Sequence, residues 1–127
     1  MIVVDVRSPK PIFEQIRDNI KQLIITGALK QDEKLPSIRE LSQMTSINPN
    51  TIQKAYRELE SEGFIYTVPG RGNFVAPAPK NLDPKKIEEL YSILKDTVTE
   101  LNFLGIPAEQ ILDFVRNTLL QGGLKHD

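Results

Sequence analysis

Apolar residues recur every three or four positions in several stretches of the chain, which is the spacing of one face of a helix. The first stretch lies between Pro11 and Gly27, and its apolar members are Ile12, Phe13, Ile16, Ile20, Leu23 and Ile24. Proline suits a first helical turn and glycine often follows a last one, so we predict a helix between these two residues.

Two further helices are predicted close together. Ser37 and Glu40 have the spacing of a capping box, in which each side chain bonds the backbone of the other, so a short helix is expected over residues 37–44. After a tight connection at 45–47, Asn48 and Pro49 supply an N-cap and a first helical residue. The third helix, about 48–62, carries an apolar stripe that includes Tyr56, which we expect to pack in the core.

The chain then changes to β-type patterning. Residues 64–68 and 73–76 are rich in β-branched and aromatic residues, and Pro69-Gly70-Arg71-Gly72 lies between them. Two such runs around a proline and glycine turn predict a hairpin, which we call the wing, about 64–76. Residues 2–6 alternate in the manner of a short strand or an ordered arm.

A stiff linker is predicted at 77–82, and two long amphipathic helices follow, from about Pro84 to near Gly105 and from about Pro107 to Gly122-Gly123. Their apolar residues cover more than one face, and a hairpin of two helices is too small to close its own core. We therefore expect a second copy of the chain to cover them. The candidate dimer-interface residues are Leu90, Leu94, Val98, Leu101, Ile111, Val115 and Leu119.

These elements predict a mainly α fold with a small β-hairpin, a winged helix-turn-helix followed by a two-helix dimerisation region. The expected divisions are a winged helix-turn-helix domain at 1–76, the linker at 77–82 and a helical dimerisation region at 83–127.

Composition narrows the class of protein. The 127 residues are 39% hydrophobic and 26% charged, as in an ordinary globular protein, and they include no cysteine, which excludes disulfides and thiolate catalysis. No apolar run approaches the roughly 18 residues of a membrane helix, and the start lacks a basic region before an apolar one. We expect a cytoplasmic protein with no membrane partner.

Charge is distributed unevenly, although the net charge is only −1 and the sequence pI is about 5.9. The segment from Lys34 to Arg57 also holds Arg39 and Lys54, against the single acid Glu40. This excess makes the first half of the chain the better partner for phosphate.

The third helix carries side chains suited to reading DNA. The N-terminal end of a recognition helix reaches base edges in the major groove, where Asn and Gln pair with adenine and Lys with guanine or phosphate. Asn50, Thr51, Gln53 and Lys54 lie at that end and off the apolar stripe, whereas the acidic far end at Glu58, Glu60 and Glu62 should point away from DNA.

At these residues the sequence resembles the GntR family of bacterial regulators, over residues 8–76. The matching segments are Leu35-Pro36-Ser37-Ile38-Arg39-Glu40-Leu41-Ser42, Asn48-Pro49-Asn50-Thr51-Ile52-Gln53-Lys54-Ala55-Tyr56-Arg57-Glu58-Leu59, Gly63-Phe64-Ile65 and Gly70-Arg71-Gly72-Asn73-Phe74-Val75. The short C-terminal region is similar to that of the YtrA subfamily, which lacks the large ligand-binding domains of other branches.

The resemblance implies a repressor that acts by steric occlusion, with Arg39 and the residues opening the third helix on DNA and the wing tip by the minor groove. Pro49 departs from branches that carry a base-reading arginine there, so their operators are no guide to this one. The candidate DNA-binding residues are Ser37, Arg39, Asn48, Asn50, Thr51, Gln53, Lys54, Arg71 and Gly72. For Asn48, N-capping alone is an equal alternative to DNA contact.

Other functions find less support. An enzyme would need a nucleophile with a base, a metal cluster or a pair of carboxylates, and the sequence indicates none of these. We expect neither a metal nor a cofactor. His126, beside the C-terminus, is interpreted as a tail residue. A winged helix that binds protein instead of DNA fits the acidic pI but not the polar opening of the third helix. The sequence leaves open the operator, the regulated genes, the direction of regulation and whether a small-molecule effector exists.

Overall fold

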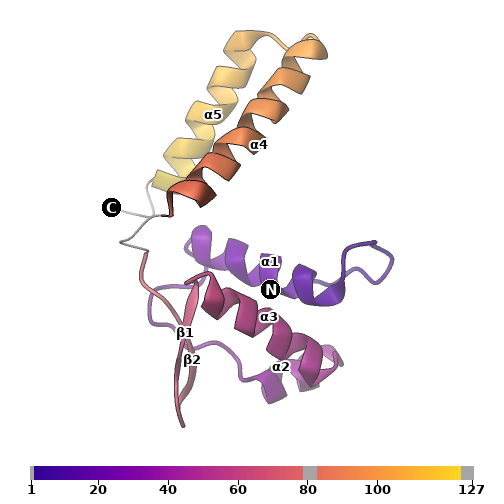
Figure 1. Ribbon diagram of the computed structural model, residues 1–127, viewed down its shortest axis with the longest axis vertical. Coiled ribbons are helices and arrows are strands. Elements are labelled where there is room, and N and C mark those ends of the chain that lie inside the picture. Colours follow the sequence, from indigo (N-terminus) through magenta and orange to yellow (C-terminus); the bar gives the residue numbers. More distant parts are fainter. Residues whose placement is uncertain (1, 79–82, 124–127) are drawn as a thin grey trace. The chain divides into compact units, whose positions relative to one another are not determined.

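The computed structural model describes residues 2–78 and 83–123 (Figure 1). The chain divides into two compact units, Met1–Pro79 and Lys80–Asp127. The predicted linker at 77–82 falls mostly outside the described residues, as does His126.

The first unit begins with three helices, α1 (Ile12–Ile25), α2 (Ile38–Thr45) and α3 (Pro49–Ser61), which confirms the three predicted helices. Pro11 was expected in the first turn of α1, but it occupies the N-cap position with an extended ψ of 147°. The carbonyl of Pro11 accepts from the backbone N–H groups of Glu14 and Gln15. Pro11 therefore precedes the first helical residue and supplies the first carbonyl acceptor of α1.

The predicted hairpin follows as β1 (Ile65–Val68) and β2 (Gly72–Val75), paired antiparallel with Ile65 opposite Val75 and Tyr66 opposite Phe74. Residues 32–35 lie along the other edge of β2. The backbone N–H of Leu35 donates to the carbonyl of Asn73 at 2.8 Å, and that of Val75 donates to the carbonyl of Glu33 at 2.9 Å. The segment leading into α2 is thereby tied to the wing.

One core holds the three helices and the wing together. Its buried members are Ile16, Ile20, Leu35, Leu41, Ile52, Ala55, Tyr56, Leu59, Ile65 and Val75. They come from α1, α2, α3, both strands and the segment before α2. Tyr56 is 3% exposed, which confirms that it packs in the core.

Residues 2–6 form an ordered arm and not a strand. The side-chain amide of Gln15 accepts from the backbone N–H of Asp5 at 2.8 Å and donates to its carbonyl at 2.9 Å, and Asn19 donates to the carbonyl of Val3 at 2.9 Å. Two side chains of α1 thus take the place of a partner strand.

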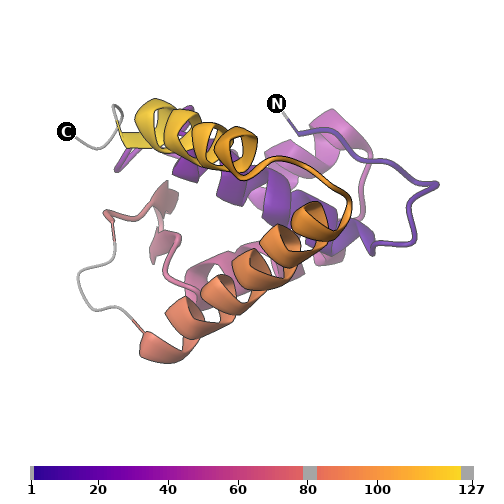
Figure 2. The same ribbon diagram turned by 90° about the horizontal axis from the view of Figure 1, so that it is seen from above.

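The second unit is a helical hairpin of α4 (Pro84–Phe103) and α5 (Ala108–Gly123). Asp83 caps α4 by accepting from the backbone N–H of Lys85, and Gly105, with φ of 84°, allows the chain to turn after α4. Figures 1 and 2 show α5 running back in the opposite direction. Across the described residues, none of the helices combines the length and apolar character needed to span a membrane.

Candidate nucleic-acid interface

The start of α2 is fixed by the predicted capping box. The backbone N–H of Glu40 donates to Ser37 Oγ at 3.0 Å, and the N–H of Ser37 donates to Glu40 Oε1 at 3.1 Å. The bond from the Ser37 backbone, followed by that from its side chain, lowers the pKa of Glu40. This turn is therefore rigid, and the exposed Arg39 projects from it without an ion pair to any described residue.

The start of α3 is capped as well. Asn48 Oδ1 accepts from the backbone N–H of Asn50 at 2.8 Å, so the capping role of Asn48 is present. That bond uses only the oxygen of the amide, and its NH₂ group remains available as a donor. Asn50 and Gln53 are exposed in the following turn, and Thr51 is half-buried.

Lys54 lies differently from the neighbouring candidates. Its ammonium is over the ring of Phe13, 3.9 Å from the ring centroid, a cation–π contact with α1. The side chain of Lys54 thus lies against α1, whereas Asn50 and Gln53 are exposed.

The far end of α3 is attached to α1 by ion pairs. Arg17 Nη1 lies 2.7 Å from Glu58 Oε1, and Lys21 Nζ lies 3.0 Å from Glu62 Oε1. Arg17 also bonds Asp18. The bonds from Arg17 to Asp18 and to Glu58 raise the pKa of the Arg17 guanidinium above its ordinary value. Glu58 and Glu62 thus face helix α1, whereas Asn50 and Gln53 near the start of α3 are exposed.

The wing turn presents a second cation. The backbone N–H of Arg71 donates to the carbonyl of Val68 at 2.9 Å, and Gly70 and Gly72 have φ of 79° and 123°. These positive angles suit glycine and make the turn tight. Arg71 is exposed at its tip and forms no ion pair with the described residues.

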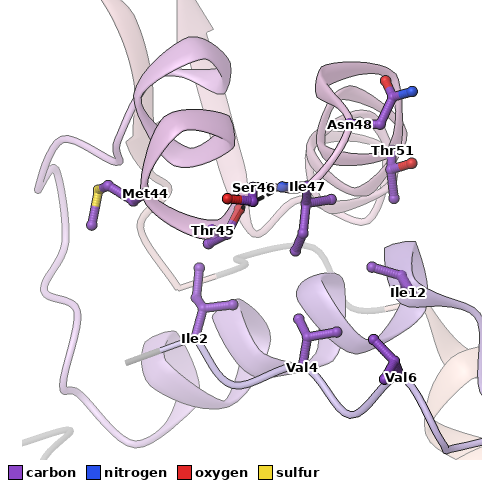
Figure 3. A pocket seen from close by; sticks show the side chains of 10 residues that line it. All are labelled: Ile2, Val4, Val6, Ile12, Met44, Thr45, Ser46, Ile47, Asn48 and Thr51. Atoms are coloured by element: carbon purple, nitrogen blue, oxygen red, sulfur yellow. Dashed lines mark hydrogen bonds between the residues drawn. The ribbon is translucent and has the colours of Figure 1, made fainter.

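A hollow of about 590 Å³ lies beside the start of α3 (Figure 3). Figure 3 shows Ile2 and Val4 pointing from the arm toward the turn between α2 and α3. The full lining is Ile2, Val4, Val6, Ile12, Met44, Thr45, Ser46, Ile47, Asn48 and Thr51. The hollow is apolar on the arm side and polar where it meets α3.

The sequence did not indicate that Lys34 lies beside the wing. It placed Lys34 in a basic segment, but residues 28–35 have no alternating pattern that would predict pairing with a strand. The structure pairs Lys34 with Phe74 on β2, which brings it to the wing. Only the local excess of positive charge could have drawn attention to it.

Three helices with a short turn between the second and third, followed by a hairpin with an arginine at its tip, define a winged helix-turn-helix. A family model described as bacterial regulatory proteins, gntR family, matches residues 12–75. The chain belongs to the GntR family.

Individual proteins support this assignment along the whole chain. The HTH-type transcriptional repressor YtrA of Bacillus subtilis (strain 168) is 38% identical over 130 residues, covering 100% of both chains. The crystal structure of a transcriptional antiterminator from Listeria monocytogenes EGD-e is similar with a TM-score of 0.77 and 39% identity, covering 93% of this chain and 89% of that one.

A second structure contains DNA. The crystal structure of AraR(DBD) in complex with operator ORE1 has a TM-score of 0.52 and 33% identity, covering 60% of this chain and 93% of that one. GntR-family regulators are DNA-binding proteins and not enzymes, so the predicted family, fold class and absence of enzymatic activity are confirmed.

Proposed function

We propose that the chain is a sequence-specific repressor that binds a palindromic or near-palindromic operator as a homodimer. The observation that carries this proposal is the contrast between the two ends of α3. Asn50 and Gln53 are exposed at its start, while Glu58 and Glu62 are paired with α1 at its end. Arg39 and Arg71 supply cations from α2 and the wing.

This arrangement suits the division of labour in DNA recognition, where base contacts specify sequence and phosphate contacts position the protein. We assign the base-reading role to Arg39 and to the opening of α3, with Asn48, Asn50, Thr51 and Gln53. Ser37, Arg71 and Gly72 belong to the flanking contacts. Lys54 remains a candidate that must leave Phe13 to reach DNA.

The homodimer rests on the surface of the second unit. None of the described residues from 84 to 121, in α4, α5 and the turn between them, is buried. Of the predicted interface residues, Leu90, Leu94, Val115 and Leu119 are 54%, 47%, 37% and 68% exposed, and Val98, Leu101 and Ile111 are half-buried. A helical hairpin with so many exposed large apolar side chains requires a partner surface, and a second copy supplies a complementary one.

Joining two heads through this unit would raise apparent affinity by roughly 10² to 10⁴ without new base contacts. Because operator DNA is its ligand, the proposed repressor acts in the cytoplasm. We propose no small-molecule effector, because the lining of the hollow beside the arm contains no charged side chain that would indicate the chemistry of such a ligand.

Selection of bound duplexes from a random DNA pool tests sequence-specific binding. We expect an inverted repeat whose half-sites are about 34 Å apart, or a multiple of that distance. A pool that yields no enriched sequence contradicts the proposal. Salt-insensitive binding, or no binding to duplex DNA, would instead favour a protein-interaction module. A reporter under the recovered operator distinguishes repression from activation.

Light scattering on the full chain and on residues 1–78 tests the dimer. The truncated chain keeps every buried core residue, so we expect it to fold as a monomer that binds the operator weakly. A monomeric full chain, or a truncated chain that remains a tight dimer, contradicts the assignment of α4 and α5.

A further inference from the structure

Lys34 is held on the outer face of the wing. It pairs with Phe74 across the edge of β2, and Phe74 pairs with Tyr66 across the hairpin. Antiparallel partners point to the same face of a sheet, and the rings of Tyr66 and Phe74 are stacked with centroids 5.5 Å apart. Ile65 and Val75 are buried on the opposite face.

The side chain of Lys34 extends toward the wing tip. Gly72 is two residues before Phe74 and therefore lies on the same face. A methyl group on the Cα of Gly72 would lie 3.1 Å from Lys34 Cε and 3.9 Å from Lys34 Nζ. The end of the lysine thus lies over the backbone of the residue next to Arg71.

Lys34 is also near the start of α2. After the two bonds from Ser37, the charge of Lys34 is a further cause that lowers the pKa of Glu40. Glu40 nevertheless uses its carboxylate on the backbone of Ser37, and no described carboxylate lies within 4.0 Å of Lys34 Nζ. An exposed ammonium therefore lies between the helix turn that carries Arg39 and the hairpin turn that carries Arg71.

We propose that Lys34 contacts a backbone phosphate of the bound duplex, beside the phosphate or groove edge that Arg71 reaches. The inference rests on the proposed DNA-binding function and adds a residue to it. Lys34 lies outside α2 and α3, and its ammonium is a flexible point charge. We therefore assign it to positioning the protein on the phosphate backbone and not to specifying sequence. Gly72 leaves the space through which Lys34 reaches the wing tip.

The test is the salt dependence of duplex binding by the full chain. Each phosphate neutralised by a cation contributes about 0.9 to the slope of log K against log salt concentration. Lys34→Ala should reduce the magnitude of this slope by about 0.9 for each protomer bound, equally on the selected operator and on an unrelated duplex. Lys34→Arg should restore it.

Lys30→Ala is the matched control. It removes the same charge from the same connecting segment, but Lys30 precedes Asp32, whose N–H bonds Val75 at the end of the wing away from the turn. The backbone bonds that tie this segment to β2 belong to Asp32, Glu33 and Leu35, so Lys34→Ala leaves them in place. Thermal unfolding of each variant verifies this.

The outcomes separate the two proposals. An unchanged slope for Lys34→Ala, or an equal loss for Lys30→Ala, overturns the phosphate contact while the parent still binds its operator. A loss confined to the operator also overturns it, because that marks a base contact. A parent chain that binds no duplex overturns the proposed function itself, and the role of Lys34 with it.

Discussion

The hydroxyl of Tyr56 in α3 donates a hydrogen bond to the backbone carbonyl of Pro36, with an oxygen–oxygen distance of 2.7 Å. Pro36 comes directly before the capped turn of α2, so this bond fixes α3 against the start of α2. Burial, followed by the charge of Glu40, raises the pKa of Tyr56 above its ordinary value. The phenol is therefore protonated at neutral pH and can donate this bond.

Tyr56→Phe should lower the free energy of unfolding by about 1 to 2 kcal/mol, because the carbonyl of Pro36 loses its buried donor while the ring still fills the core. Urea denaturation measures the change. Tyr66→Phe is the matched control: it removes an exposed bond to Asp32 and should have a smaller effect. Equal losses in both variants would contradict a special role for the Tyr56 bond.

The capping box makes stability depend on pH. The pKa of Glu40 is lowered from its ordinary value of about 4.5, chiefly by the backbone bond from Ser37. The stabilisation is complete above the unfolded value and is lost as pH falls through the lower folded value. Glu40→Gln should therefore flatten the acid side of the stability profile, measured by urea denaturation between about pH 3 and 6. Glu60→Gln is the control, because it removes an exposed carboxylate of α3 without removing a capping bond.

Two substitutions at Asn48 separate capping from DNA contact. Asn48→Ala should cost about 1 kcal/mol of stability, while Asn48→Ser retains an N-cap oxygen and should cost less. If the free NH₂ group contacts DNA, both variants bind the operator more weakly than the parent. Chemical denaturation and a binding titration distinguish the two roles. Parent-like binding by Asn48→Ser would assign the residue to capping alone.

Arg39→Ala and Asn50→Ala should each weaken operator binding by roughly 1 to 3 kcal/mol and leave the fold intact, if each makes a good base contact. Both side chains are exposed and outside the core. Arg71→Ala should weaken binding more uniformly across sequences, because a wing arginine responds to phosphate and groove width. Titrations on the operator and on a mutated operator test this difference. Parent-like binding by all three variants would show that the assigned surface is wrong.

Much of the fold was predictable because its signals are local. The helix caps depend on residues only a few positions apart, namely Ser37 with Glu40 and Asn48 with the residues that follow it. The predicted capping bonds are present at both helices. Pro11 was displaced by one position, since proline also satisfies an N-cap position when its carbonyl starts the helix.

The features that sequence did not reveal depend on distant pairing. Lys34 meets Phe74 some forty residues away, and Gln15 bonds the backbone of the arm, ten residues away at Asp5. Contacts between residues so far apart produce no repeating pattern in the sequence from which they could be predicted. The position of Lys54 was also unforeseen, because a residue off the apolar stripe can still fold back over an aromatic ring such as that of Phe13.

The attachment of α3 to α1 through Glu58 and Glu62 has a consequence for the evolution of such regulators. The two ion pairs lie on later turns than Asn50 and Gln53, and the buried residues of α3 do not include these two. Substitutions at these two exposed positions should therefore change the free energy of unfolding little. After gene duplication, such substitutions can accumulate without loss of the fold. A duplicated copy can thus come to bind a different DNA sequence while selection still preserves the core and the ion pairs between α3 and α1.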